Sequence, residues 1–191
     1  MTKTSIKPGT MVYPAPAVMV SCGSKPDEYN IITIAWTGNI CSAPPMCYIS
    51  LRPQRYSYDI IKRNMEFVIN LTTEDLAEKT DWCGIKSGRD YNKFSETGLH
   101  PEKATVVNAP LILESPVNIE CVVKEIKELG VHHMFISEVV AINADDNCFV
   151  KGKDQVKNPL ENLTCYIHNN YYQTGEKIGK FGFAAKKTPN K

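Results

Sequence analysis

Two neighbouring strand patterns between residues 117 and 142 constrain the fold of this chain more than any other feature of its sequence. In residues 117–124 (VNIECVVK), the odd positions are all apolar, so they form one apolar face of a strand. Three of the four residues expected on the opposite face are polar: Asn118, Glu120 and Lys124. A turn at 128–130 leads into 132–142 (HHMFISEVVAI), which is largely apolar on both faces. We therefore expect two antiparallel strands, the second of which is covered on each side by a second layer or by a second subunit.

Short strand patterns recur along the rest of the chain. They are apolar, β-branched or aromatic runs bounded by turn residues, and they occupy 17–22, 31–37, 46–52, 66–71 and a short piece near 165–167. Helical patterns are fewer: Ser57 can cap a helix that ends near Asn64, Thr73 can cap a second, and a weaker pattern spans 90–96. The number of strands favours a closed or nearly closed barrel, so the expected fold class is mainly β, a β-barrel with a few helices.

The length and composition indicate a single domain in the cytoplasm. With 191 residues, the chain suits a single domain over residues 1–191, with a core of roughly 10–170 and a C-terminal extension over 171–191. A net charge of +1 argues against a nucleic-acid or membrane-surface partner. No signal-peptide pattern and no apolar run of the ~20 residues needed for a membrane helix occurs, so we expect a cytoplasmic protein.

The cysteines and histidines do not form a metal-site pattern. Seven cysteines are present, an odd number without any CxxC pair, which fits neither a disulfide framework nor a zinc ribbon. His132 and His133 are adjacent on an expected strand, so their side chains point to opposite faces and do not easily bind one ion. We expect no metal site.

The stretch from Arg52 to Ser57 is a candidate phosphate site. An expected strand leads here into a loop with two arginines, and the loop ends at the start of a helix. Guanidinium groups, free backbone N–H groups and the positive end of the helix dipole would then lie together. The alternative is that Ser57 only caps the helix and that the arginines are solvated.

Two further stretches suit a planar ligand. In 31–37, Thr33, Ala35 and Thr37 form a face of small and hydroxyl-bearing residues, whereas Ile32, Ile34 and Trp36 are expected to enter the core. In 87–94 (SGRDYNKF), the basic residues could contact a phosphate and the aromatic residues could cover a ring. Alternatively, the first is an ordinary solvent-facing strand surface and the second a polar loop that runs into a helix.

At these places the chain resembles the flavin-reductase-like, FMN-binding split-barrel family, within it the flavoredoxin branch. The stretches that carry the resemblance occur in order along roughly residues 10–145: 30–38 (NIITIAWTG), 49–53 (ISLRP) with Tyr56-Ser57, 66–71 (EFVINL), 87–94 and 133–139. At 136–138 this chain has Ile-Ser-Glu, where relatives often have a glycine before the glutamate.

The resemblance implies a homodimeric barrel that holds FMN in a groove near the subunit interface. Thr33, Ala35, Trp36 and Thr37 would line the isoalloxazine ring, while Ser50, Leu51 and Arg52 would contact the ring edge and the ribityl chain. Tyr56 and Ser57 would lie at the phosphate end, with Lys93 closing over it. Asn70 and His133 would lie nearby, His133 toward the nicotinamide side.

The expected function is an FMN-binding oxidoreductase of the NAD(P)H:flavin reductase type, in which no side chain needs to act as a catalytic acid or base. One alternative is a flavoredoxin-like electron carrier that a redox protein partner reduces. Another is a non-catalytic barrel that binds flavin. The chain has no GxGxxG, P-loop or GxSxG element, which argues against Rossmann-type nucleotide binding and against a hydrolase.

Overall fold

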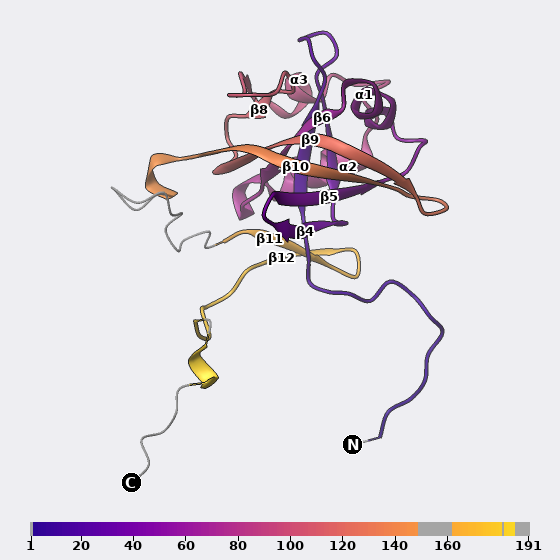
Figure 1. The fold of residues 1–191 in the computed structure, drawn as a ribbon, viewed down its shortest axis with the longest axis vertical. Helices are drawn as coiled ribbons and strands as arrows, with labels where there is room; N and C mark the ends of the chain where they lie inside the picture. The colour runs from indigo at the N-terminus through magenta and orange to yellow at the C-terminus, as the bar shows by residue number, and fades with distance from the viewer. Residues whose placement is uncertain (1, 149–161, 181, 186–191) are drawn as a thin grey trace.

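The computed structural model describes residues 2–148, 162–180 and 182–185 (Figure 1). Its largest element is an antiparallel sheet of seven strands. In spatial order these strands are β3 (Asn30–Ile34), β2 (Val18–Cys22), β6 (Glu66–Leu71), β9 (Val117–Glu128), β10 (His133–Ala144), β5 (Pro45–Leu51) and β4 (Thr37–Ser42). The predicted strands over 17–22, 46–52 and 66–71 are confirmed to within one residue at each end. The predicted hairpin between 117 and 142 is also confirmed, with strands that extend to Glu128 and Ala144 and a turn that contains Gly130 with a φ of 96°.

The chain closes this sheet into a barrel between β3 and β4. These strands are at opposite edges of the sheet, yet only Ala35 and Trp36 separate them. Three Cα–Cα steps reach about 11 Å at most, whereas seven strands laid flat would be roughly 29 Å wide. The sheet must therefore curl until its edges meet, and the Ser50 N–H donates to the Trp36 carbonyl oxygen at 2.8 Å beside the closure. The prediction of a mainly β barrel with a few helices is confirmed.

The closure corrects two expectations about residues 31–37. The stretch was predicted to be one strand, but it divides into β3 and the start of β4 where the chain crosses between the sheet edges. Trp36 was expected in the core with Ile32 and Ile34. Those two isoleucines are buried, whereas the Trp36 side chain is 40% exposed, because it lies in the crossing segment where strand alternation no longer applies.

Helix α1 (Tyr56–Asn64) closes one end of the barrel. Tyr58, Ile60 and Ile61 of this helix belong to the same buried cluster as the inward-facing residues of the strands. Ser57 was predicted to be the N-cap, but the helix begins at Tyr56 and its cap position is Arg55, which makes no side-chain capping bond. The Tyr58 N–H donates to the Arg55 carbonyl oxygen at 2.9 Å, which leaves the N–H groups of Tyr56 and Ser57 at the start of the helix for another acceptor.

A second layer covers the outer face of β2 and β3 (Figure 1). It contains a 3-10 turn (Glu74–Leu76, preceded by Thr73), α2 (Ala77–Ile85) and α3 (Lys93–Thr97). Leu76, Cys83 and Phe94 of this layer pack on Met19 and Ile31 of the barrel. Thr73 lies at the predicted cap position but makes no side-chain capping bond, and the helix predicted over 90–96 begins at Lys93.

The segment from residue 101 to 116, with the short strands β7 (Pro101–Glu102) and β8 (Leu111–Ile112), lies against β6 and β9. Consequently Asn118 and Glu120, predicted on the polar face of β9, are both buried. The Glu120 carboxylate accepts hydrogen bonds from the backbone N–H groups of residues 105–107 at 2.7–3.0 Å and from Asn143 Nδ2 at 2.6 Å. Burial alone would raise the pKa of Glu120, but these hydrogen bonds outweigh it and hold the pKa below its usual range.

Replacing Glu120 with glutamine should lower the free energy of unfolding by about 3 kcal/mol, because an amide NH₂ group would face backbone donors and leave at least one of them unsatisfied. The matched control is Glu125→Gln, an exposed residue of the same strand. Because the pKa is lowered in the folded state, Glu120 stabilises the protein above its unfolded-state pKa, and this stability is lost as the pH falls through the folded-state pKa. Urea unfolding at pH 7 and pH 4 measures both effects; equal midpoints for the two variants would contradict the role of Glu120.

A smaller sheet lies outside the barrel and consists of β1 (Ala15–Pro16), β11 (Thr164–Ile167) and β12 (Asn170–Gln173). The strand predicted near 165–167 is β11. The remaining elements are 3-10 turns, Asp146–Cys148 at the turn predicted after β10 and Phe183–Ala185. In the described ranges, no helix has the length and apolar character needed to cross a membrane.

Candidate functional site

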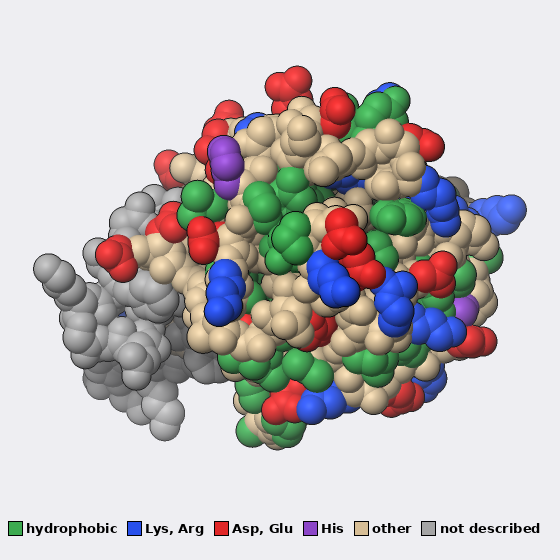
Figure 2. Space-filling view, turned by 90° about the horizontal axis from the view of Figure 1, so that it is seen from above, with side chains coloured by type: hydrophobic (Ala, Val, Ile, Leu, Met, Phe, Trp, Pro, Cys, Tyr) green, Lys and Arg blue, Asp and Glu red, His purple; other side chains and the backbone are tan. Residues whose placement is uncertain are grey.

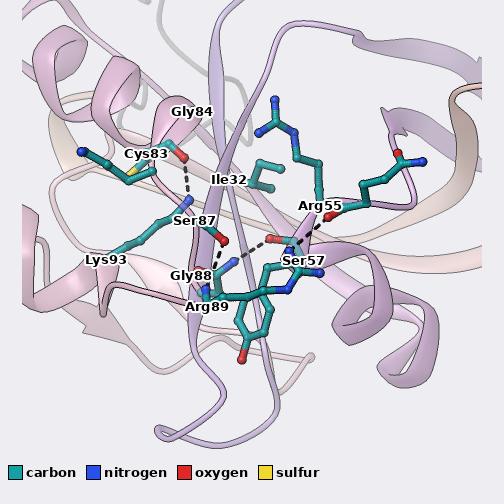
Figure 3. Close-up of a pocket in the computed structure, with 13 residues that line it drawn as sticks. Ile32, Arg55, Ser57, Cys83, Gly84, Ser87, Gly88, Arg89 and Lys93 are labelled. Carbon is teal, nitrogen blue, oxygen red and sulfur yellow. Dashed lines mark hydrogen bonds between the residues drawn. The ribbon is translucent and has the colours of Figure 1, made fainter.

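A cavity of about 150 Å³ lies where the first turn of α1, the end of α2 and the loop after it meet β3 (Figure 3). Asn30 and Ile32 of β3 and Lys93 of α3 complete its lining, with residues 54–57, 83–84 and 86–89. The loop between β5 and α1 and the loop between α2 and α3 thus lie side by side, although they are about 30 residues apart in the chain.

The cavity is strongly cationic. Arg55, Lys86, Arg89 and Lys93 line it, and none of its thirteen lining residues is acidic. The ion pairs found among the described residues do not include any of these four cations. The first turn of α1 adds its N–H groups and the positive end of its dipole. On the face above α1 and α3, by contrast, basic and acidic side chains are interspersed (Figure 2). The excess of positive charge is therefore confined to the cavity, and the cavity suits an anion.

Lys93 is the most buried of these cations, with 3% of its surface exposed. Its Nζ donates a hydrogen bond to the Cys83 carbonyl oxygen at 2.6 Å. Burial lowers the pKa of Lys93 to about 8; Cys83 and Cys22 oppose this shift, and Arg55 adds to it. An anion in the cavity would stabilise the charged form of Lys93 and reverse the shift.

Ser57 forms part of the cavity wall rather than a helix cap. Its Oγ accepts a hydrogen bond from Asn30 Nδ2 at 2.7 Å, and both residues are almost fully buried. Gly88 lies directly against this pair: a Cβ at Gly88 would be 2.2 Å from Asn30 Oδ1 and 2.6 Å from Tyr56 Cδ1. The loop at 86–89 therefore approaches the start of α1 as closely as a glycine allows.

The variant Gly88→Ala should weaken the binding of an anionic ligand about tenfold and lower the free energy of unfolding by about 2 kcal/mol, because the added methyl group must push the loop away from Asn30. Gly38→Ala is the control, since its Cβ would lie at 3.4 Å from the Tyr48 ring, an ordinary contact. Ligand titration and urea unfolding measure the two effects, and the explanation is wrong if the two glycine variants behave alike.

Two further cavities continue the first one along β3. One of about 230 Å³ is lined by Thr33 and Ala35, by Gly84 of α2 and by Tyr166 and Tyr171 of the small sheet. The next, of about 340 Å³, is lined by Ala35, Trp36, Thr37, Tyr48 and residues 9–16. Gly84 lines both the first and the second cavity and Ala35 both the second and the third, so the three cavities are neighbours in one row, which we call the groove. Its lining changes from cationic at one end to aromatic and apolar at the other.

This change along the groove fits FMN. The phosphate, a dianion at neutral pH, matches the four cations and the N-terminus of α1, and the flat ring matches the small residues Thr33 and Ala35 with aromatic side chains beside them. Thr33 Oγ1 already donates to the Thr80 carbonyl oxygen. The sequence suggested that the strand face containing Thr33 is free, but α2 covers this face. A flavin ring must therefore enter beside the helix.

The structure brings seven of the predicted site residues to this groove. Tyr56, Ser57 and Lys93 line its cationic end, and Thr33, Ala35, Trp36 and Thr37 line the continuation. The Trp36 and His132 rings are in contact, with 4.4 Å between centroids and a tilt of 38° between their planes.

Five predicted residues do not line the groove. The Leu51 side chain is buried in the barrel core, so a ligand could meet only its backbone, and Ser50 is half-buried beside the barrel closure. Arg52 is exposed near His132, whose pKa is lowered by burial first and then by Arg52 and Arg55. Arg55 lines the cationic cavity where Arg52 does not.

Asn70 and His133 are engaged elsewhere. Asn70 is fully buried, donates to the Met19 carbonyl oxygen at 3.0 Å and to Ser21 Oγ at 2.9 Å, and accepts from the Ile112 N–H at 3.0 Å, so it joins strands. His133 Nδ1 shares a hydrogen bond of 2.8 Å with the Tyr58 hydroxyl, at the junction of β10 and α1.

Several groove residues were absent from the predicted set. Arg55 and Arg89 lie within stretches that the sequence marked as candidate phosphate contacts, so a local signal was present. Gly84, Tyr166 and Tyr171 had no such signal. The two tyrosines are more than 120 residues away in the sequence from Thr33 and Ala35, with which they line the cavity. In the parts of the chain that the structure describes, no group of three or more potential metal ligands occurs.

A barrel that closes between β3 and β4, with a cationic-to-aromatic groove on its outside, defines the class of flavin-binding split barrels. The chain belongs to the flavin reductase like domain family, whose model matches residues 10–174. It is 30% identical to the flavoredoxin of Desulfovibrio vulgaris (Miyazaki F), with a TM-score of 0.86 over 97% of this chain and 100% of that one.

Relatives of known sequence extend the comparison. An uncharacterized protein of Pyrococcus abyssi is 29% identical over 77% of this chain and 84% of its own length. The reductase component of a 4-nitrophenol 4-monooxygenase/4-nitrocatechol 2-monooxygenase from Rhodococcus opacus is 26% identical over 59% of this chain and 57% of its own length. The predicted membership of the flavin-reductase-like family and its flavoredoxin branch is confirmed.

Proposed function

We propose that this protein binds FMN in the groove and transfers electrons from NAD(P)H through it to an acceptor. The observation that carries the proposal is the groove itself, in which four cations without ion-pair partners among the described residues lie at one end and aromatic side chains at the other. When bound, FMN supplies the redox chemistry, accepting a hydride and passing electrons on.

The residues of the chain bind and orient the cofactor. Arg55, Lys86, Arg89 and Lys93 neutralise the phosphate, and the N–H groups at the start of α1 donate to its oxygens. The small side chains of Thr33 and Ala35 would leave room for the ring, and Tyr166, which lines the same cavity, would lie beside it. No side chain has to donate or remove a proton in this scheme.

The cofactor is tested by the visible absorption spectrum of the purified protein and by chromatography of what heat releases. A yellow protein that releases FMN is the expected result. A colourless protein that also fails to bind added FMN would refute the proposed function.

The donor is tested by adding NADH or NADPH to the flavin-loaded protein without oxygen. We expect at least one nicotinamide to bleach the flavin band faster in the presence of the protein than with free FMN at the same concentration. If neither does so, NAD(P)H is not the donor.

A second candidate, a flavoredoxin-like electron carrier reduced by a protein partner, is favoured by the 30% identity to a flavoredoxin over nearly the whole chain. The two candidates share the cofactor and differ in the donor. Rapid reduction by a reduced ferredoxin, together with no reduction by NAD(P)H, would select the carrier.

The proposal includes a homodimer. Large apolar side chains lie exposed on β10 and on the N-terminal segment, with Ile142 54% and Val12 94% exposed, and Figure 1 shows this segment extending away from the barrel. A second copy of the chain would cover such surfaces. Light scattering at micromolar concentration should give twice the mass of 21.4 kDa, and a monomer would contradict the expectation.

A further inference from the structure

The third cavity of the groove, of about 340 Å³ at its aromatic end, has no charge in its lining. One wall contains Ala35, Trp36, Thr37 and Tyr48, and the other is the N-terminal segment from residue 9 to 16. None of these residues has a charged side chain, and most are apolar or aromatic. The volume is within the range of small-molecule sites. In contrast to the cationic end of the groove, this cavity therefore suits a small, neutral, planar molecule.

Contacts outside the cavity hold its walls in place. Thr37 Oγ1 donates a hydrogen bond to the Tyr48 carbonyl oxygen at 2.5 Å, which joins β4 to β5. The Trp36 ring contacts His132, the residue before β10. The N-terminal wall is attached to the small sheet, where β1 pairs with β11 and the Tyr13 ring lies 4.6 Å from the His168 ring. The fold therefore positions the side chains of both walls.

Two tyrosine hydroxyl groups give this cavity its hydrogen-bonding capacity. Tyr13 lines one wall and Tyr48 the other, and both side chains are half-buried. Within residues 2–148, 162–180 and 182–185, neither hydroxyl has a hydrogen-bond partner, whereas the Thr37 hydroxyl is already engaged. A phenol is a neutral donor. Two such donors match a ligand with acceptor oxygens on an uncharged ring, whereas the phosphates of NAD(P)H would meet no cation here.

We propose that the third cavity binds a neutral quinone, the acceptor to which this protein delivers electrons. The inference rests on the proposed function, because the electrons come from reduced FMN. Ala35 lines both the second and the third cavity, so a quinone in the third would be next to a ring in the second. The quinone gains two electrons and two protons, one proton on each oxygen, and reduced FMN loses the same electrons and protons. The Tyr13 and Tyr48 hydroxyls would stabilise the negative charge that develops on the quinone oxygens.

The test is equilibrium dialysis of duroquinone against the flavin-free and the FMN-loaded protein. Duroquinone has a methyl group at every ring carbon beside a carbonyl, so the exposed thiol of Cys41 finds no unsubstituted carbon to attack. We expect one duroquinone per chain in both forms, with dissociation constants that agree within about twofold. Tyr13→Phe and Tyr48→Phe should each weaken binding about fivefold, the effect of losing one hydrogen bond between uncharged groups.

Electron transfer is tested by anaerobic stopped flow, in which the FMN-loaded protein is first reduced with dithionite and then mixed with duroquinone. The flavin should be reoxidised, and half-saturation should occur at the dissociation constant found by dialysis. This concentration should rise about fivefold in each tyrosine variant. If bound duroquinone does not reoxidise the flavin, a quinone is not the acceptor.

Three controls locate the quinone and separate its binding from a general loss of structure. Durene has the same ring and methyl groups without oxygens, so the two tyrosine variants should bind it as the unmodified protein does. Tyr172→Phe changes an exposed tyrosine that lines none of the three cavities, and it should bind duroquinone normally. In Trp82→Phe, Trp36 is the one remaining tryptophan, and duroquinone should quench its fluorescence. Urea unfolding midpoints show that each variant is folded.

A failure of both protein forms to bind duroquinone would overturn the proposal, as would undiminished affinity in both tyrosine variants. Displacement of bound FMN by duroquinone would assign the cavity to the flavin, and displacement of duroquinone by NAD⁺ would assign it to the donor; either result overturns the proposal. A protein that binds no FMN would instead refute the proposed function. Because duroquinone binding is also measured on the flavin-free protein, the two failures are distinguishable.

Discussion

Replacing Arg55 and Arg89 together with alanine should weaken FMN binding by about 100-fold or more while the affinity for riboflavin changes by less than about threefold. Both guanidinium groups line the cationic cavity, and riboflavin lacks the phosphate that they would contact. A hydrogen bond to a charged group contributes about 1.5–3 kcal/mol, and the loss of two of them corresponds to at least a factor of about 100 at 1.4 kcal/mol per factor of ten. Fluorescence titration of the apoprotein with each flavin measures both affinities.

Arg52→Ala is the matched control for this pair. Arg52 is an exposed arginine three positions before Arg55, and it does not line the cavity. The structure therefore predicts a small effect at the position that the sequence favoured and a large one at Arg55. An equal loss of FMN and riboflavin affinity in the double variant would show that the phosphate lies elsewhere, and a loss in Arg52→Ala as large as in Arg55→Ala would restore the first assignment.

FMN affinity should fall by up to tenfold per pH unit above pH 8, whereas riboflavin affinity should stay nearly constant there. Lys93 has a pKa of about 8 in the flavin-free protein, mainly because burial disfavours its charge. A phosphate dianion beside Lys93 raises that pKa, so binding favours the protonated lysine. The contribution of Lys93 is therefore fully present below pH 8 and is lost as the pH rises through 8 toward the higher pKa of the complex.

Dissociation constants for both flavins at intervals between pH 6 and pH 10 measure this dependence. A phosphomonoester is a dianion above its second pKa of about 6, so FMN should bind best between about pH 6 and pH 8. Lys93→Met retains much of the buried stem without the charge, and it should bind FMN more weakly at pH 7 and abolish the decline above pH 8. An unaltered decline in Lys93→Met would assign the titration to another group.

Much of the strand structure could be predicted because strands leave a local signal. Residues 117–124 have the period of two that a half-buried strand requires, whereas 66–71 and 132–142 are apolar, β-branched runs, and each forms a strand as expected. The prediction over 31–37 was wrong for a reason that no local pattern contains. The same β-branched run crosses from one edge of the barrel to the other, and the crossing point is where the sheet closes.

Burial was harder to predict than strand position. Asn118 and Glu120 are polar residues at alternating positions, a pattern that is typical of an exposed face, yet the segment from residue 101 to 116 covers both. Whether a polar residue on a strand is exposed depends on what the rest of the chain places over it. For Glu120 that cover also supplies three backbone donors, which makes the buried charge stable.

The sequence by itself determined the mainly β class, the positions of most strands along the chain, and the two loops that contribute positive charge to the groove, because each depends on residues close together in the chain. Only the tertiary structure decided that Arg55 lines the cavity and Arg52 does not, and that Asn70 joins strands. It also placed Tyr166, Tyr171 and Asp81 around a cavity on the outside of β3. The physical reason is that barrel closure and the small outer sheet bring together segments more than 80 residues apart. Which side chains then meet depends on the strand register and on the segments that cover each strand, and both are properties of the whole fold.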